Sequence, residues 1–335
     1  MDLSILIASF EARDALVACL AALGRALEAT PTLEIEIIIV DNGSRDGSLQ
    51  VARDSPLRPR LVASAENRGF ASAINRGWRL SRGRHLLLLN TDVEVDPEAL
   101  AAGVALLDGA SEIGVVGAAL RHADGRPQRS VHALPGWQSE LFPDIALRQM
   151  RPAGFDMGGS GRLETGGRSG KEGAGSRGVR DVEAVRGAVF FIRGGLAEKL
   201  GRLDERYFFF LEETDYCRRV RAAGFRVVQA GAVRAKHGLG ESSKRRAPLA
   251  TRIEFHRSLY RYLDVVGGSA LRRVARAVRT ARSGGSLLLL APLCLISEAA
   301  RRRFSERFGL VLWHLRGCPS EPSLAEALRR EDRTR

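Results

Sequence analysis

The sequence predicts an α/β protein whose doubly wound, mostly parallel sheet carries flanking helices and is followed by a basic helical segment. Apolar runs alternate with stretches of helical spacing from residue 3 to residue 109, which is the pattern of a parallel sheet. Several of the apolar runs end in polar residues, as expected where a sheet presents its ligand site. Beyond residue 244 the chain becomes helical and rich in arginine.

The elements are predicted in the following order. A strand over 3–9 precedes a helix whose leucines recur at helical spacing: Leu16, Leu20, Leu23 and Leu27. Further strands are predicted over 35–40, 60–64 and 86–89, and a helix begins at Pro97, a residue favoured at the first helical position. A glycine-rich stretch at 154–178 is expected to be a mobile loop. Strands over 181–195 and 225–231 follow, with a short helix at 195–201 after the first of them.

The positive charge of the chain is concentrated at its C-terminal end. The formal charge is +13, and residues 241–335 hold 20 Lys+Arg against 9 Asp+Glu, a balance of +11. The ten apolar residues from Leu287 to Ile296 fall short of the roughly 20 that span a bilayer. This segment is either a solvated flank or an anchor on an anionic membrane surface, with Arg301, Arg302 and Arg303 binding lipid.

Other bulk properties exclude several classes of protein. Nucleic acid is not expected as a partner, because aromatic residues make up only 6% of the chain and none interleave the basic runs as a stacking platform. The four cysteines are widely scattered, which indicates neither a disulfide framework nor a metal-binding spacing. The N-terminal residues lack the basic and long apolar regions of a signal peptide. We therefore expect a cytoplasmic protein.

An acidic stretch after residue 207 allows two interpretations. The segment FFFLEETDYCRRVRAAG, residues 208–224, places Glu212, Glu213 and Asp215 beside one another. Acids are favoured in the first turn of a helix, where free N–H groups and the helix dipole attract negative charge. Alternatively, one of these carboxylates is a catalytic base. Asp215 is expected to lie in the first helical turn and to pair with Arg218 or Arg219.

Acidic and amide side chains follow two of the predicted strands. Asp41 ends the strand over 35–40, where it either forms an Asp-Asn-Gly turn or accepts hydrogen bonds from a nucleobase or ribose. Asn90 and Asp92 follow the strand over 86–89. They either form a turn or, through Asp92, hold a divalent cation that bridges two phosphates.

Three further polar residues lie in a loop or directly after a strand. Asn67 and Asn75 lie in a glycine-containing loop that leads into a helix, and free N–H groups at a helix start suit phosphates or sugar hydroxyls. His237 follows a strand. It is either a surface residue or a metal ligand.

Taken together and in order, these motifs resemble glycosyltransferase family 2, in particular its bacterial rhamnosyltransferase-like branch. The resemblance runs from about residue 3 to residue 243, with the glycine-rich stretch as an interruption. It is carried by SILIASF, CLAAL, VDNGSRDGS, NRGFASAINRG, LLLLNTDVEVDPEAL, VRGAVFFIRGG, LGRLDERYFFFLEETDYCRRVRAAGFRVV and KHGLGESS. Many short motifs in the right order are more specific than any one of them.

The resemblance implies a GT-A fold with a nucleotide-sugar-binding half (1–120), an acceptor-side half (121–244) and a basic, partly amphipathic helical tail (245–335). It implies an enzyme of cell-wall or polysaccharide biosynthesis that uses Mg²⁺ or Mn²⁺. The donor would be a dTDP- or UDP-sugar, with rhamnose as a candidate, and the acceptor a hydroxyl of a glycan or lipid-linked sugar. The expected location is the inner face of the cell membrane, as a peripheral protein.

The resemblance also implies roles for single residues. Asp41 would contact the base or ribose, Asn67, Asn75 and Asn90 would bind the donor, Asp92 and His237 would hold the metal or diphosphate, and Asp204 with Glu205 would begin the acceptor side. Glu213 matches the general base, and Glu212 is the second candidate. A base opposite the leaving group would invert the anomeric centre.

The chain departs from the family pattern at three places. Asn90 replaces the first acid of the DXD element, so metal binding would depend more on Asp92 and His237. The catalytic acid pair is Glu-Glu instead of Glu-Asp. Phe10-Glu11 replaces the Tyr-Asn that relatives often carry, which puts a donor contact there in doubt.

Other functions are weighed against this one. The main alternative is a non-catalytic homologue that binds a nucleotide sugar or serves as a membrane-assembly scaffold. A sugar nucleotidyltransferase would need a glycine-rich loop after the first strand, which IASFEARDAL lacks. A processive synthase would carry a Q-x-x-R-W element, which is also missing.

Overall fold

The computed structural model describes residues 1–142, 178–238, 247–320 and 323–332. Except for Gly178, the glycine-rich stretch predicted at 154–178 lies outside these ranges. The chain divides into two compact units. The first comprises Met1–Leu134, Pro152–Tyr207 and Glu212–Gly240, and the second comprises Pro135–Arg151, Phe208–Leu211 and Glu241–Arg335. The limits predicted at residues 120 and 244 remain predictions.

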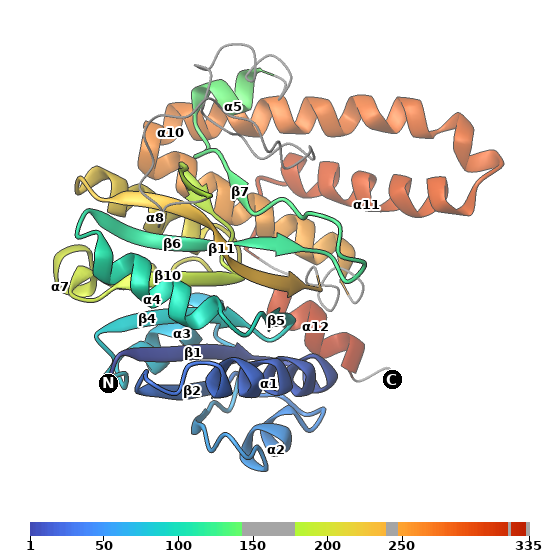
Figure 1. Cartoon of the computed structure of the whole chain (residues 1–335). Helices are drawn as coiled ribbons and strands as arrows, with labels where there is room; N and C mark the ends of the chain where they lie inside the picture. The colour runs from blue at the N-terminus through green and yellow to red at the C-terminus, as the bar shows by residue number, and fades with distance from the viewer. Residues whose placement is uncertain (143–177, 239–246, 321–322, 333–335) are drawn as a thin grey trace. The chain divides into compact units, whose positions relative to one another are not determined.

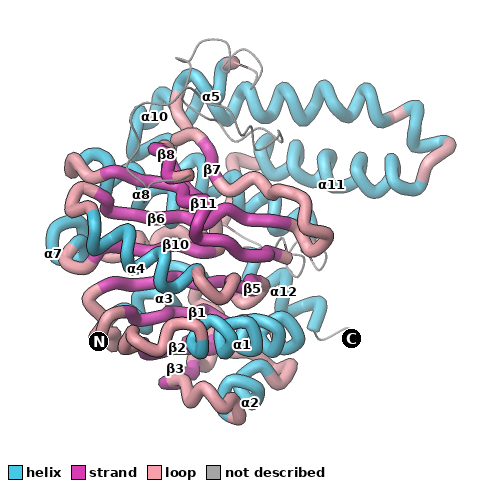
Figure 2. The backbone as a smooth tube through the Cα atoms, in the orientation of Figure 1, coloured by secondary structure: helices cyan, strands magenta, loops and turns pink. Residues whose placement is uncertain are grey.

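The first unit is built on a central sheet, which Figure 1 colours by chain position and Figure 2 by secondary structure. Within the described residues the strand order is β3-β2-β1-β4-β10-β6-β11-β5, with β8 paired to β11. The strands are β1 (Leu3–Ser9), β2 (Ile35–Asp41), β3 (Arg60–Ala63), β4 (His85–Asn90), β5 (Val93–Val95), β6 (Ile113–Arg121), β8 (Val179–Asp181), β10 (Val189–Arg193) and β11 (Arg226–His237). A separate ribbon pairs β7 (Val131–His132) with β9 (Ala184–Val185).

The directions of the strands confirm a mostly parallel sheet. Strands β3, β2, β1, β4, β6 and β11 run the same way, whereas β10, β5 and β8 oppose them. The antiparallel β10 lies between β4 and β6. Its sequence, VFFIR, is as apolar as its parallel neighbours. A buried strand shows no alternation that would reveal its direction, so the sequence did not predict this reversal.

Helices cover both faces of the sheet. They are α1 (Arg13–Glu28), α2 (Ser48–Arg53), α3 (Phe70–Trp78), α4 (Ala99–Gly109), α7 (Leu196–Leu200) and α8 (Glu212–Ala222). On β1, Ile5 and Ile7 pack in one core with α1, α2 and α4, whereas Leu6 packs in another with α3, α7 and α8. Side chains of a strand point alternately to opposite faces, so the two cores are the two faces of a doubly wound sheet.

The second unit is helical among its described residues. It contains α5 (Trp137–Leu141), α10 (Pro248–Leu290), the 3₁₀ turn η1 (Pro292–Leu295), α11 (Glu298–Leu315) and α12 (Leu324–Asp332). Helix α10 is interrupted at Gly268, where φ is 65°. Tyr260 of α10 stacks on Trp313 of α11, and its hydroxyl lies 2.7 Å from Nε2 of His314. Helices α10 and α11 therefore form a packed hairpin, whereas the sequence predicted only that this segment is helical.

Candidate active site

The strand register brings several polar residues to one edge of the sheet. Ser9 of β1 stands opposite Asp41 of β2, and Ala8 of β1 stands opposite Asn90 of β4. The Asn90 N–H donates to the carbonyl of Ala188, which precedes β10, at 3.1 Å. The ends of β2, β1 and β4 and the beginning of β10 thus lie side by side. This is the edge at which open α/β sheets bind ligands.

Asp41 closes the predicted turn with one carboxylate oxygen and keeps the other without a hydrogen-bond partner among the described residues. Its carboxylate Oδ2 accepts the N–H groups of Gly43 and Ser44 at 3.2 and 3.0 Å, which closes the predicted turn. Its Oδ1 is buried and has no hydrogen-bond partner in the described part of the chain. A buried acceptor without a partner costs free energy, and a nucleobase N–H or a ribose hydroxyl is a donor that can satisfy it. The neighbouring Ser9 hydroxyl is in the same condition.

Asn42, a residue that was not identified from the sequence, orders the loop beside Asp41. Its side-chain amide donates to Oδ1 of Asn67 at 2.9 Å and to the carbonyl of Gly69 at 3.0 Å. Its Oδ1 accepts the N–H of Arg68. Asn67 in turn accepts the N–H of Gly69, where φ is 89° just before α3. The loop of Asn67, Arg68 and Gly69 is therefore held by Asn42, the residue that follows Asp41.

Asn75 lies in α3 and faces a different loop. It is buried, its amide donates to the Leu203 carbonyl at 2.8 Å and to Glu205 at 3.0 Å, and its Oδ1 accepts the Leu203 N–H at 3.1 Å. These bonds occupy both N–H groups of the amide and one acceptor site. Asn75 therefore joins α3 to the segment that carries the predicted Asp204–Glu205 pair.

Asp92 and His237 come together across two paired strands. His237 ends β11, where it stands opposite Val93 of β5, and its Nε2 lies 3.5 Å from Oδ1 of Asp92. The other ring nitrogen, Nδ1, lies 2.7 Å from Oε1 of the buried Gln128, whose amide also donates to the His237 carbonyl at 3.2 Å. Because an amide oxygen only accepts, Nδ1 carries the proton. Nε2 is then the ring nitrogen that faces the carboxylate of Asp92.

This arrangement suits a metal ligand pair with a fixed second partner. Metal-binding histidines usually donate their other N–H to an oxygen that sets the tautomer, and Gln128 does this for His237. No group of three or more His, Cys, Asp or Glu side chains capable of holding a metal occurs among the described residues. A cation bound by Asp92 and His237 would therefore take its remaining ligands from substrate phosphates and water, as Mg²⁺ and Mn²⁺ sites often do.

Glu213 lies in the first turn of α8 and contacts the chain just before β10. A Cβ built on Gly187 would stand 3.3 Å from Cβ and Cγ of Glu213, so the absent side chain makes room for this carboxylate. Gly187 directly precedes Ala188, the hydrogen-bond partner of Asn90. Burial raises the pKa of Glu213, against its own N–H, the Arg186 charge and the Thr214 N–H. A carboxyl group with a raised pKa beside a ligand edge has the character of a general base.

The neighbours of Glu213 are also placed by the β7–β9 ribbon. His132 of β7 lies 2.9 Å from the Thr214 hydroxyl of α8, and burial followed by the charges of Arg186 and Arg129 lowers the pKa of His132 to about 4. Burial likewise lowers the pKa of Arg186, while Glu213 raises it. Arg186, in the VRGAVFF motif, was not identified from the sequence. It supplies positive charge close to the candidate base.

The other two acids of the first α8 turn have different surroundings. Glu212, the first residue of α8, is buried. Asp215 is bound by two arginines, Arg218 and Arg219, each at 2.8 Å, which confirms the predicted pairing. Just before α8, Phe210 and Leu211 adopt φ values of 75° and 64°. Such strained residues cluster at functional sites.

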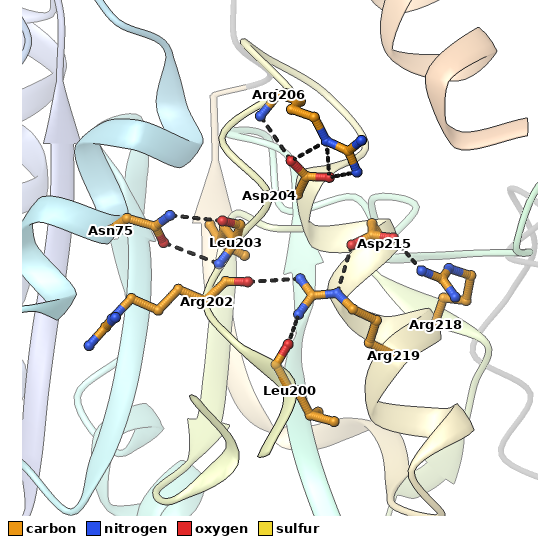
Figure 3. A network of polar contacts seen from close by, with 9 residues as sticks. All are labelled: Asn75, Leu200, Arg202, Leu203, Asp204, Arg206, Asp215, Arg218 and Arg219. Atoms are coloured by element: carbon orange, nitrogen blue, oxygen red, sulfur yellow. Dashed lines mark hydrogen bonds and ion pairs between the residues drawn. The ribbon is translucent and has the colours of Figure 1, made fainter. Parts of the chain in front are cut away.

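Figure 3 shows how the Asp215 pair extends into the loop between α7 and α8. Arg219 reaches from α8 to the carbonyls of Leu200 and Arg202 at 2.7 and 2.9 Å. From the other side, Asn75 holds Leu203. Within this loop Asp204 binds the Arg206 N–H and guanidinium. These contacts fix the part of the loop that follows α7, up to residue 206.

Comparisons with known proteins agree with this architecture. Residues 4–165 match the family model of Glycosyl transferase family 2. An N-acetylglucosaminyl-diphospho-decaprenol L-rhamnosyltransferase of Mycobacterium tuberculosis is 26% identical over 255 residues, which cover 68% of this chain and 74% of the relative. A dolichol-phosphate mannosyltransferase of Mycosarcoma maydis is 35% identical over 77 residues, 22% of this chain and 26% of the relative.

A solved structure shares the fold. The mannosyltransferase PcManGT of Pyrobaculum calidifontis, in complex with GDP-Man and Mn²⁺, aligns with a TM-score of 0.56 and 13% identity. The alignment covers 96% of this chain and 88% of that protein. Its low identity bears on the fold alone. With the sheet topology it shows the GT-A fold, and by the family match this chain contains a glycosyltransferase family 2 domain.

Proposed function

We propose that the enzyme transfers a hexosyl or deoxyhexosyl group from a nucleotide-diphosphate sugar to a hydroxyl of a glycan or lipid-linked acceptor, with inversion. The observation that supports this is the gathering of Asp41, Glu213 and the Asp92–His237 pair among the strand ends of one sheet. Together they offer an acceptor for the nucleoside, a base for the acceptor hydroxyl and ligands for a cation at the diphosphate.

In the proposed reaction, Glu213 takes the proton of the acceptor hydroxyl while its oxygen attacks the anomeric carbon. A positioned base of this kind contributes about 10²–10⁴-fold to the rate. The raised pKa of Glu213 brings it closer to the operating pH, which favours proton transfer. Glu212 remains the second candidate for this role.

Asp92 and His237 would hold a divalent cation at the leaving diphosphate. When bound, such a cation neutralises the negative charge that grows on the departing oxygens. One nitrogen and one carboxylate ligand fit Mn²⁺ better than Mg²⁺, which strongly prefers oxygen. At the other end of the donor, the Oδ1 of Asp41 would accept from the base or ribose. The loop held by Asn42 and Asn67 would border this pocket.

The nature of the substrates is inferred from the relatives. The names of the mycobacterial and fungal relatives carry a polyprenol diphosphate and a dolichol phosphate. A lipid-linked acceptor is therefore our first choice here, and rhamnose from a dTDP-sugar is the first donor to test. Among the described residues no helix combines the length and apolar character needed to cross a membrane. We propose that the basic helical unit binds the anionic inner face of the membrane instead.

The test combines donor turnover with two variants. The full chain is incubated with dTDP-, UDP- and GDP-sugars, with Mn²⁺, with Mg²⁺ or with excess chelator, and nucleotide release is measured. Release is expected with Mn²⁺ and one class of donor, and it should be largely lost in Asp92→Asn and Glu213→Gln. Release that persists in chelator would refute metal dependence. A product with the anomeric configuration of the donor, seen by NMR, would refute inversion.

A further inference from the structure

The most exposed large apolar side chains of the described residues gather where α10 turns into α11. Leu288 and Leu289 are 79% and 75% exposed, and Leu295 and Ile296 are 85% and 84% exposed. We call residues 287–296 the apolar tip. Single exposed leucines are ordinary on protein surfaces, but a contiguous apolar patch marks a binding surface.

The apolar tip has a defined conformation. Helix α10 ends at Leu290, and Pro292–Leu295 form the single turn η1. The Ser297 hydroxyl then caps α11 by accepting the Ala300 N–H, and Arg301 donates to the carbonyl of Cys294 at 2.9 Å. The apolar side chains are thus presented by a hydrogen-bonded turn at the end of a helical hairpin, which Figure 1 shows at the end of α10 and the beginning of α11.

The charge beside the tip identifies its partner. Arg282 precedes it, Arg301, Arg302 and Arg303 follow it, and all four are exposed. The nearest acid, Glu298, is bound to Arg302. A second copy of the chain packed on this surface by two-fold symmetry would bring the same arginines together. An anionic lipid surface complements them, since each arginine near such a surface contributes to binding.

We propose that the apolar tip inserts into the interfacial layer of an anionic membrane while the neighbouring arginines bind lipid headgroups. This is the combination expected of an interfacial amphipathic element, in which apolar area and electrostatic attraction add. The inference rests on the membrane attachment proposed above and sharpens it. It assigns insertion to the apolar tip and electrostatic adsorption to the neighbouring arginines.

A native cysteine reports insertion directly. Cys294 lies within the tip and Cys318 lies beyond α11, whereas the remaining cysteines, Cys19 and Cys217, are buried. In Cys318→Ser an environment-sensitive dye is attached to Cys294, and in Cys294→Ser it is attached to Cys318. With vesicles of phosphatidylcholine and phosphatidylglycerol, the dye at Cys294 should shift to the blue and be quenched by brominated acyl chains. The dye at Cys318 should change little.

Flotation with the same vesicles separates the two parts. Serine at Leu288, Leu289, Leu295 and Ile296 together should weaken binding on the order of 100-fold at any salt concentration, because each buried leucine contributes substantially. Leu315→Ser, at an equally apolar site that is 70% exposed outside the tip, is the control and should float like the wild type. Serine at Arg302 and Arg303 should weaken binding at low salt, with the difference fading at high salt.

The outcomes distinguish insertion of the apolar tip from membrane attachment and from the proposed enzymatic activity. If the arginine variant detaches but the tip variant floats normally, the protein adsorbs electrostatically and insertion is refuted. If neither the wild type nor the variants float while donor turnover is intact, membrane attachment fails and the enzymatic proposal stands. A dye shift at Cys294 that grows with protein concentration in the absence of vesicles would assign the tip to self-association and overturn the proposal.

Discussion

The acids near the sheet edge, Asp41 and Glu213, differ from Glu205 and Asp215 in how their carboxylates are bound. Asp215 in α8 is held by two arginines, and Glu205 in the loop before α8 receives bonds from Asn75 and Arg79. At the sheet edge, Asp41 keeps one buried oxygen without a hydrogen-bond partner among the described residues, and burial raises the pKa of Glu213.

This difference separates acids bound by the fold from candidates for ligand binding or catalysis. At the exposed Glu205, the effect of partial burial is outweighed by hydrogen bonds from Asn75 and Arg79, which lower the pKa below its ordinary value. Glu213 is much more deeply buried, and its burial raises the pKa against the Arg186 charge and two backbone N–H groups. A native fold usually satisfies its buried acids, so those that it leaves unsatisfied are candidates for ligand binding or catalysis.

The most direct test of this difference replaces Glu213 and Asp215, both in α8, by the corresponding amides. Glu213→Gln should lower kcat by about 10²–10⁴-fold, since the base is lost, while the fold is kept. Asp215→Asn should leave kcat at low temperature close to that of the wild type. It should lower the free energy of unfolding, because Arg218 and Arg219 lose a buried partner. Steady-state turnover and urea unfolding of both variants measure this.

The opposite assignment has a clear signature. If Glu213→Gln keeps kcat within a few-fold of the wild type while Glu212→Gln loses it, Glu212 is the base. If Asp215→Asn loses turnover without losing stability, the division between structural and catalytic acids is wrong.

The second test addresses the fixed tautomer of His237. Gln128→Ala removes the acceptor of the Nδ1 proton, and loss of such a partner typically costs 10–100-fold in metal affinity. Mn²⁺ titration of donor turnover should show this as a higher half-saturating concentration. The matched control is Gln229→Ala. Gln229 is a buried glutamine of β11, the strand that ends at His237, and it binds Arg180 and the Ala118 carbonyl instead. An equal loss in both variants would point to damage of β11.

The third test separates the two asparagines around α3. Asn75→Ala leaves the buried N–H and carbonyl of Leu203 without partners, which should cost about 1–3 kcal/mol in the free energy of unfolding. The donor KM should stay near the wild-type value. Asn67→Ala should instead raise the donor KM, because it loosens the loop beside Asp41. A rise in donor KM for Asn75→Ala at unchanged stability would show that Asn75 binds the donor, as the family resemblance implied.

The sequence predicted the elements that periodicity and strand-end chemistry determine. The strand at 3–9, the polar end of β2 and the helix after Glu212 follow from local patterns, and the family resemblance added the GT-A fold. The approach of Asp92 to His237 was expected only from that resemblance, since 145 positions of chain separate the two residues and they meet through the pairing of β5 with β11.

Long-range partners were not predictable from local patterns. Asn42 looked like an ordinary turn residue, Gln128 belonged to no recognisable motif, and the VRGAVFF motif gave Arg186 no role of its own. Their importance comes from neighbours more than 20 positions away. Gly187 is similar, since only packing shows that its missing side chain leaves space for Glu213. The reversed direction of β10 was hidden for the same reason, because strand pairing is a tertiary property.

The smallest effect we expect is a gain in stability when the candidate base is neutralised. A carboxyl group whose pKa is raised by folding binds its proton more tightly in the folded chain. Its contribution to stability is therefore present below its ordinary pKa of 4.5 and is lost as the pH rises through the raised value. Glu213→Gln removes this loss, so its Tm should exceed that of the wild type at neutral pH and approach it toward pH 4.5.

Arg186 provides the matched control for this last prediction. Its charge lowers the pKa of Glu213 against the effect of burial, so Arg186→Leu should raise that pKa further. The acid limb of the activity profile should then move to higher pH, and the stabilising effect of Glu213→Gln should be larger in the Arg186→Leu background. A Tm for Glu213→Gln below that of the wild type at neutral pH would mean that the fold stabilises the charged carboxylate, as it does for Asp215, and would count against Glu213 as the base.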